Sequence, residues 1–190
     1  EKARKAVAKQ LFAQTDEIIF TSGGTEANNL ALFGTAYAKK RRGTKIVTTS
    51  VEHSSIMESC KRLEQEGFEI AYVSPRQDGV VHTEDILAEV NDNTVLVSVM
   101  YVNNDTGAIM PVAEIFDAVK GKKSDIICHT DAVQAFGKIA VNPKKLGADL
   151  VSVSAHKVHS PKGCGAIYIK KGVRLVPRTY GGEQEKKIRP

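Results

Sequence analysis

The chain has 190 residues, of which 42% are hydrophobic and 26% are charged, and its formal net charge is +5. This composition is typical of a globular protein, and the length is sufficient for one α/β domain with its own hydrophobic core. No apolar run approaches the roughly 18 residues of a membrane span. The composition therefore excludes a protein with membrane-spanning helices, and we predict no membrane partner.

The predicted helices and strands alternate along the chain. The first twelve residues have helical spacing and no initiator methionine, so we interpret the chain as part of a longer protein that is cut at both ends. In chain order, the prediction is a helix over 1–12, a strand over 17–21, a helix over 25–42, a strand over 45–49, a helix over 54–66, a strand over 68–73, a helix over 83–90 capped by Thr83, a strand over 94–101, a helix over 111–120 beginning at Pro111, strands over 126–130 and 150–153, and a hairpin over 165–176. This alternation predicts an α/β fold with a mostly parallel sheet, helices on both faces and one C-terminal antiparallel strand or hairpin.

The cysteines and the basic residues exclude several classes of protein. Cys60, Cys128 and Cys164 lie far apart and form no Cys-x-x-Cys pair, which argues against a disulfide framework or a zinc site and favours a cytoplasmic protein. Cys60 and Cys128 fall within a predicted helix and a predicted strand, so we expect both in the core, and we expect Cys164, which lies between two glycines, to point into a tight turn. The basic run 39–42 (Lys-Lys-Arg-Arg) is interpreted as the end of a surface helix, where cations suit the helix dipole. No aromatic residues alternate with it, so we predict no nucleic-acid partner.

Two polar residues at strand ends carry most of the functional information. Lys157 follows the apolar stretch 149–153, and Asp131 ends the apolar run 126–130. Ligands of parallel α/β sheets bind beyond the carboxyl ends of the strands, so these side chains should meet there. A lysine that can form a Schiff base and an aspartate that can pair with a pyridinium nitrogen are what pyridoxal 5'-phosphate (PLP) requires.

Other residues at strand ends allow both a functional and a structural interpretation. The run 22–26 (Ser-Gly-Gly-Thr-Glu) can bind a phosphate at a helix start, or it is a tight turn with Thr25 as the helix cap. His53 can stack on an aromatic cofactor or simply begin a helix. The run 103–107 can bind a ligand or form a turn, and Gln134 lies one predicted helical turn after Asp131. His156, Lys157 and His159 lack an acidic partner at a suitable spacing, so we predict no metal.

Taken together, these runs resemble the cysteine desulfurases, which are PLP enzymes of the class V aminotransferase group with fold type I. The resemblance covers essentially all 190 residues, and the combination is far more specific than any single run. The matching runs, in family order, are Phe-Thr-Ser-Gly-Gly-Thr-Glu-Ala-Asn-Asn at 20–29, Glu-His at 52–53, Val-Asn-Asn-Asp-Thr-Gly at 102–107, His-Thr-Asp-Ala-Val-Gln at 129–134, Ser-Ala-His-Lys at 154–157 and Gly-Gly-Glu-Gln-Glu at 181–185.

The resemblance implies a role for each matching position. Lys157 would bind PLP as a Schiff base and later move the Cα proton, while Asp131 would keep the ring nitrogen protonated. His53 would stack on the ring and assist proton transfer. Gln134 would bind the ring hydroxyl, and Asn104 would contact the cofactor or the substrate carboxylate. The residues that would hold the phosphate are Gly24, Thr25, Ser154 and His156.

The sequence also departs from the family pattern. Asp105 replaces the usual Glu, and Val158 and Ser160 replace the common Phe and Gly after the lysine. The family's N-terminal strand, its Arg-x-Gly-Thr segment, its small C-terminal domain and its persulfide cysteine have no counterpart in these residues. We therefore expect residues 1–190 to be the PLP-binding large domain of a longer enzyme, and to be inactive alone.

The implied full enzyme converts L-cysteine to L-alanine and passes the sulfur to an enzyme cysteine as a persulfide, for iron–sulfur clusters or tRNA thiolation. Its implied partners are L-cysteine, a second copy of the chain in a homodimer and a sulfur-acceptor protein. Two alternatives stay open. The chain could belong to another class V PLP enzyme, such as a selenocysteine lyase or an aminotransferase, or it could be a non-catalytic scaffold or dimerisation fragment.

Overall fold

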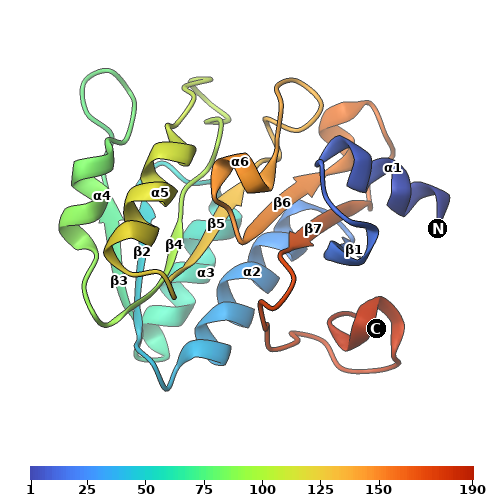
Figure 1. The fold of residues 1–190 in the computed structure, drawn as a ribbon, viewed down its shortest axis with the longest axis horizontal. Helices are drawn as coiled ribbons and strands as arrows, with labels where there is room; N and C mark the ends of the chain where they lie inside the picture. The colour runs from blue at the N-terminus through green and yellow to red at the C-terminus, as the bar shows by residue number, and fades with distance from the viewer.

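The computed structural model describes residues 1–190 and contains one seven-stranded sheet with helices packed on both faces (Figure 1). The strands are β1 (Ile18–Thr21), β2 (Lys45–Thr49), β3 (Glu69–Val73), β4 (Thr94–Ser98), β5 (Ile127–Asp131), β6 (Leu150–Ser154) and β7 (Gly165–Ile169). The α-helices are α1 (Lys2–Gln10), α2 (Gly24–Lys39), α3 (Ser54–Gln65), α4 (Thr83–Glu89), α5 (Val112–Lys122) and α6 (Pro143–Leu146), and 3-10 turns lie at η1 (Thr15–Glu17), η2 (Ala155–Val158) and η3 (Gln184–Lys187).

The sheet is mostly parallel, as predicted. Its strand order is β1-β7-β6-β5-β4-β2-β3, and only β7 runs antiparallel to its neighbours β1 and β6. Every other strand points the same way, so their carboxyl ends share one edge of the sheet, the upper edge in Figure 1. The loops that follow these strands gather along this edge, where ligands of α/β sheets bind.

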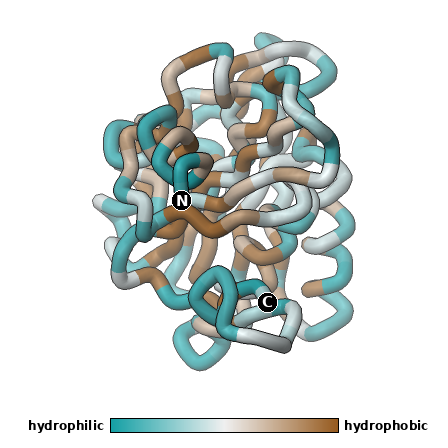
Figure 2. The backbone as a smooth tube through the Cα atoms, turned by 90° about the vertical axis from the view of Figure 1, so that its right-hand side faces the viewer, coloured by the Kyte–Doolittle hydropathy of each residue, from teal (hydrophilic) through white to brown (hydrophobic).

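Each face of the sheet has its own hydrophobic core, which confirms helices on both faces. Neighbouring residues of one strand point to opposite faces: Val47 packs into the core under α1, α4, α5 and α6, and Ile46 packs into the core under α2 and α3. The central strands are buried throughout. Their near-continuous apolar runs are typical of parallel strands covered on both sides, and Figure 2 shows the hydrophobic segments inside the molecule.

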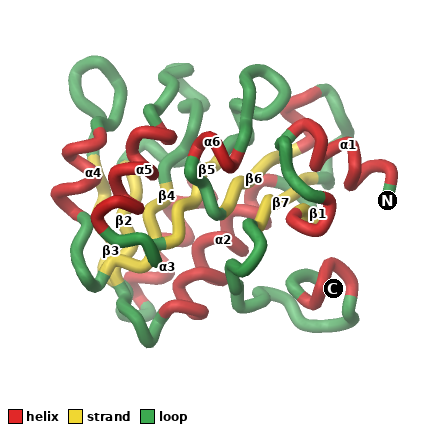
Figure 3. Tube along the Cα trace, viewed as in Figure 1, coloured by secondary structure: helices red, strands yellow, loops and turns green.

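The predicted hairpin over 165–176 is wrong in its second half. The strand β7 forms and pairs with β1 and β6, but residues 173–176 leave the sheet as a loop (Figure 3). There the amide of Val176 donates to the carbonyl of Gly34 in α2, and Leu175 packs beside that glycine. Because β1 already occupies the free edge of β7, a returning strand has no place in the sheet, and the chain covers α2 instead.

Several predicted boundaries also need correction. The strand predicted over 94–101 ends at Ser98, although the amides of Val99 and Tyr101 still donate to carbonyls of the neighbouring strand β5 after the regular geometry of β4 ends. Thr83 is the first residue of α4 and not its cap, since the N-cap position is His82, and the Thr83 hydroxyl donates to Glu114 at 2.6 Å. Pro111 precedes α5 as its N-cap residue. The short helix α6 was not predicted, although its Asn cap followed by Pro is a standard start signal.

The C-terminal segment folds back on the edge strand β1. Glu185 forms a paired contact with Arg4 and accepts a hydrogen bond from the backbone amide of Phe20 at 2.8 Å. This carboxylate satisfies an amide that an edge strand would otherwise expose. No helix in the structure has both the length and the apolar composition needed to cross a membrane.

Candidate functional site

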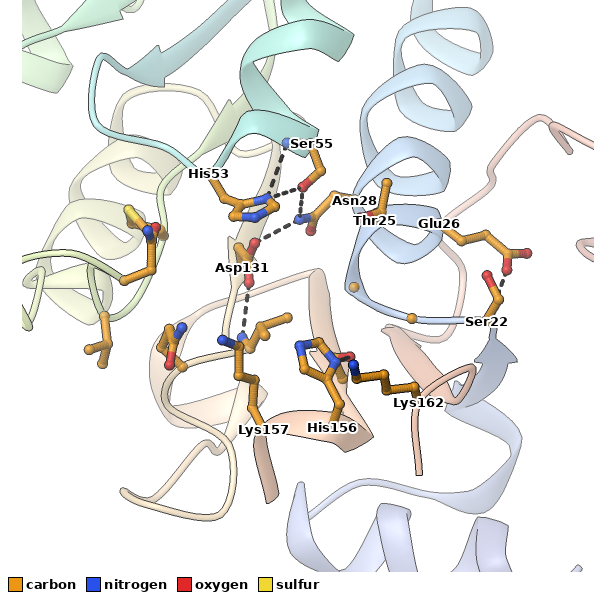
Figure 4. Close-up of a pocket in the computed structure, with 18 of the residues that line it drawn as sticks. Ser22, Thr25, Glu26, Asn28, His53, Ser55, Asp131, His156, Lys157 and Lys162 are labelled. Atoms are coloured by element: carbon orange, nitrogen blue, oxygen red, sulfur yellow. Dashed lines mark hydrogen bonds between the residues drawn. The ribbon is translucent and has the colours of Figure 1, made fainter. Parts of the chain in front are cut away.

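A cavity of about 640 Å³ opens at the carboxyl ends of the strands (Figure 4). This volume lies within the range of small-molecule sites. All nine residues that the sequence pointed to line it, namely Gly24, Thr25, His53, Asn104, Asp131, Gln134, Ser154, His156 and Lys157. The fold therefore brings together segments more than 130 residues apart in sequence.

Asp131 lies deep in this cavity, where β5 ends. Asp131 is only 6% exposed. Each of its carboxylate oxygens accepts one hydrogen bond, Oδ1 from the amide of Val133 at 2.9 Å and Oδ2 from Nδ2 of Asn28 at 2.6 Å. Burial raises the pKa of Asp131, and these two hydrogen bonds together with the charge of His53 partly offset that rise. No lysine or arginine pairs with this carboxylate, so it is a buried acid that lacks a cationic partner.

The glycine-rich turn 22–24 lies beside the end of β6 because Gly165 has no side chain. A Cβ on Gly165 would lie 2.6 Å from the Cα of Gly23, and a Cβ on Gly24 would lie 2.8 Å from Cγ2 of Val133. Because these glycines have no Cβ, the start of α2 lies close to Ser154, whose hydroxyl is 2.7 Å from Nδ1 of His156.

The start of α2 offers unpaired donors to this end of the cavity. The helix is capped by Gly23 and begins at Gly24, so Thr25 is not the cap and its hydroxyl is free for another partner. The amides of Gly24, Thr25 and Glu26 donate no backbone hydrogen bond, as is usual in the first turn of a helix. Such amides, with the positive end of the helix dipole, form a site for an anion such as a phosphate.

His53 enters the cavity from the loop between β2 and α3. It is the N-cap of α3, and its Nδ1 accepts from the amide of Ser55 at 3.1 Å and lies 2.8 Å from the Ser55 hydroxyl. The helix-start interpretation is therefore correct, and the same ring also lines the cavity. The preceding Glu52 is buried, and its Oε1 accepts from the amide of Met100 at 2.7 Å and from the Thr49 hydroxyl at 3.0 Å. These bonds fasten the His53 loop to the end of β4.

Lys157 lies in η2, directly after β6, and its Nζ makes no hydrogen bond or ion pair. In Figure 4 it lies with His156 on the other side of Asp131 from His53. A second lysine, Lys162, also lines the cavity beside His156. The cavity thus has one free amine near the buried carboxylate and a second one toward the turn that precedes α2.

Asn104 and Gln134 lie at the rim. The 103–107 loop is organised by the buried Asn103, whose Oδ1 accepts from the amides of Asp105 and Thr106 and whose Nδ2 donates to the carbonyl of Val51. This leaves Asn104 exposed at the cavity edge. The prediction that Gln134 lies on a helix is wrong, because residues 132–139 form successive turns. Gln134 nevertheless lines the cavity.

Comparison with known proteins identifies the family. The pattern described as aminotransferase class-V matches residues 1–189. The chain belongs to the class-V aminotransferases.

Several relatives carry more specific names. Cysteine desulfurase IscS of Dictyoglomus turgidum is 47% identical over 185 residues, which is 97% of this chain and 46% of the relative. A solved structure titled NifS-like protein has a TM-score of 0.96 at 43% identity, over 100% of this chain and 52% of that one. A second structure, SspA in complex with cysteine, has a TM-score of 0.94 at 36% identity, over 99% of this chain and 54% of that one. The chain thus spans about half the length of the relatives that it matches.

Three polar residues in or behind the cavity were not identified from the sequence. Asn28 and Ser55 contact Asp131 and His53, and Glu52 fastens the His53 loop. A signal for Asn28 does exist, because it is a polar residue between Ala27 and Leu30 on the buried face of α2. Its partner, 103 residues away, is not visible in the sequence.

The cysteines of this class-V aminotransferase chain divide into two kinds. Cys60 and Cys128 are buried, as predicted, and burial raises the pKa of each thiol to about 12. Cys164 was expected to point into a tight turn, but it is exposed. Its backbone explains the difference, because its carbonyl binds the amide of Ala155 while the side chain stays on the surface.

Proposed function

We propose that residues 1–190 are the PLP-binding large domain of a cytoplasmic cysteine desulfurase. In this proposal the full enzyme takes L-cysteine, releases L-alanine and transfers the sulfur to one of its own cysteines. The names of the relatives support the reaction, and a structural neighbour titled as a complex with cysteine supports the substrate. A homodimer and a sulfur-acceptor protein are part of the same proposal.

The observation that carries the proposal is the set of polar and charged groups around one cavity. A buried carboxylate without a cationic partner requires a compensating charge, and a protonated pyridine nitrogen would supply it at Asp131. The unpaired amides of α2 and the hydroxyls of Thr25 and Ser154 suit a phosphate dianion. The free amine of Lys157 suits the aldehyde of PLP. The residues present therefore fit this cofactor.

PLP, when bound, acts as an electron sink that makes a bond at the amino-acid Cα easier to break. The chain positions this chemistry with its own groups. Asp131 holds a proton on the ring nitrogen through a charge-assisted hydrogen bond. Lys157 Nζ takes and returns the Cα proton as a general base and acid. His53 presents Nε2 to the cavity, since Nδ1 is occupied by Ser55. Gln134 and Asn104 bind polar groups at the rim.

Sulfur transfer also needs a thiolate that attacks the substrate sulfur. A high pKa and burial make Cys60 and Cys128 unsuitable for this step. Cys164 is exposed, but it lies outside the set of residues that line the cavity. In our proposal the persulfide therefore forms on a cysteine outside residues 1–190.

Covalent labelling tests the cofactor site. The chain is incubated with PLP, reduced with borohydride, digested and mapped by mass spectrometry. We expect one pyridoxyl phosphate group per chain, on Lys157, and no label in Lys157→Ala. Lys162→Ala is the matched control, because it removes the other lysine of the cavity and should keep the label on Lys157. Equal labelling of several surface lysines would contradict the proposal.

The substrate is tested on the full-length enzyme. Incubation with L-cysteine should release alanine and leave a protein persulfide. If the enzyme releases alanine only from selenocysteine, or transfers an amino group to a keto acid, the corresponding alternative class V activity replaces this one. A protein that binds no PLP at all would favour the scaffold alternative.

A further inference from the structure

A line of hydrogen bonds connects Asp131 with His53 inside the cavity wall (Figure 4). Nδ2 of Asn28 lies 2.6 Å from Oδ2 of Asp131 and 2.9 Å from Oγ of Ser55, and that Oγ lies 2.8 Å from Nδ1 of His53. Asn28 is 1% exposed and Ser55 is 7% exposed. The two residues come from different helices, α2 and α3, and both also border the cavity.

The side-chain amide of Asn28 determines which atom donates and which accepts in these hydrogen bonds. Nδ2 of Asn28 has two hydrogens, and its two acceptors are Asp131 and Ser55. The opposite amide orientation would place Oδ1 against the Asp131 carboxylate, so that two acceptors would meet without a hydrogen between them. An ionised Asp131 therefore selects the observed orientation, in which Oδ1 of Asn28 is buried and has no partner.

The same assignment determines which ring nitrogen of His53 carries the proton. Because Ser55 Oγ accepts from Asn28, its own hydrogen is free to be donated to Nδ1 of His53. The backbone amide of Ser55 donates to the same Nδ1 at 3.1 Å. A nitrogen that accepts hydrogen bonds carries no proton, so the neutral ring holds its proton on Nε2.

We propose that Asn28 and Ser55 are positioning residues, which keep Asp131 oriented as a carboxylate and keep His53 in the tautomer with its proton on Nε2. The functional meaning rests on the proposed PLP site, because it assigns Asp131 and His53 to one bound ring. The hydrogen bonds through Asn28 and Ser55 would then couple the charge of Asp131, which pairs with the ring nitrogen, to the position of the proton on the His53 ring. Neither Asn28 nor Ser55 has to touch a reacting atom for this role.

Two NMR readouts on the chain without PLP test the line itself. The first is the titration of the ¹³C-labelled Asp131 carboxyl. The second is the long-range ¹H–¹⁵N pattern of the His53 ring, which distinguishes the two tautomers. His53→Gln assigns the ring signals among the five histidines. The groups whose charge acts on Asp131 are His53 and Glu52, and Lys157 opens onto the same cavity, so the titration is repeated in Glu52→Gln.

Substitutions at Asn28 and at Ser55 should affect different NMR readouts. Asn28→Ala removes a hydrogen bond to a carboxylate, so the Asp131 midpoint should rise by about one to two pH units. Ser55→Ala keeps that bond, so the midpoint should stay, while His53 should gain a population with the proton on Nδ1. Ser55→Thr retains the hydroxyl and should restore the wild-type ring pattern.

Asn29→Ala is the matched control, because Asn29 is the next residue of α2 and its amide binds only the carbonyl of Thr25 in its own helix. It should change neither readout. If Asn28→Ala does not fold, Asn28→Leu, which is close in size, takes its place. An Asp131 midpoint equal to that of Asn29→Ala, or a His53 ring with its proton on Nδ1 in the wild type, would overturn the proposal.

Affinity for PLP is measured separately. Asn28→Ala should weaken PLP binding about tenfold or more, while Asn29→Ala should not. If the wild type binds no PLP, the proposed function fails, but the NMR results still decide whether the hydrogen-bond line exists. If PLP binds and the two asparagine variants have equal affinity, the coupling to the cofactor is wrong and the proposed function stands.

Discussion

Glu52→Gln should remove a pH-dependent loss of stability in the protein without cofactor. Burial, opposed by hydrogen bonds from Met100 and Thr49 and reinforced by the charge of Asp131, raises the pKa of Glu52 from 4.5 to about 8. Its Oε2 is buried without a partner. A glutamine keeps the Oε1 acceptor for both hydrogen bonds and carries no charge at any pH, so it isolates the cost of ionising this side chain.

The sign and the size follow from proton linkage. Between pH 4.5 and about 8 the folded protein holds the Glu52 proton and the unfolded chain does not, so stability falls as the pH rises. Each pH unit in this window costs about 1.4 kcal/mol. Over the whole window the wild type should therefore lose about 4–5 kcal/mol relative to Glu52→Gln.

Urea unfolding of both proteins at about pH 5 and about pH 8 measures this difference through the linear extrapolation. We expect similar free energies of unfolding at the lower pH and a clearly more stable variant at the higher pH. Glu64→Gln is the control for losing one carboxylate, because Glu64 is exposed on the same helix α3. A difference between wild type and Glu52→Gln that is the same at both pH values would refute the reasoning.

Three further predictions address the cofactor, the packing and the reaction. Asp131→Ala in the full enzyme should lower cysteine turnover far more than PLP content, and unchanged turnover per bound PLP would contradict the role of this carboxylate. Gly165→Ala should reduce the free energy of unfolding by about 1–3 kcal/mol, because its Cβ would lie 2.6 Å from the Cα of Gly23, whereas Gly121→Ala meets nothing within 4 Å and should not be destabilised. Residues 1–190 alone, supplied with PLP and cysteine, should form no cysteine-dependent persulfide, and alanine release at the rate of the full enzyme would point to the exposed Cys164.

Much of the fold, and the main residues that line the cavity, could be predicted from the sequence. The alternation of apolar strands and amphipathic helices determined a mostly parallel sheet, since buried parallel strands need connecting helices. Lys157 and Asp131 each follow an apolar run, and the carboxyl ends of parallel strands share one edge, so their meeting was predictable. These inferences use local patterns and one general rule of α/β topology.

Tertiary structure alone decided the features that depend on contacts between distant segments. Asn28 meets Asp131 across 103 residues, and Gly165 admits Gly23 only because β7 lies between β1 and β6. The same strand order excluded the second half of the predicted hairpin, because the edge that it needed was already occupied. Whether Glu52 keeps its proton likewise depends on how completely the folded chain removes it from water. Sequence periodicity records which face of an element is buried, but not which polar group of another element it will meet there.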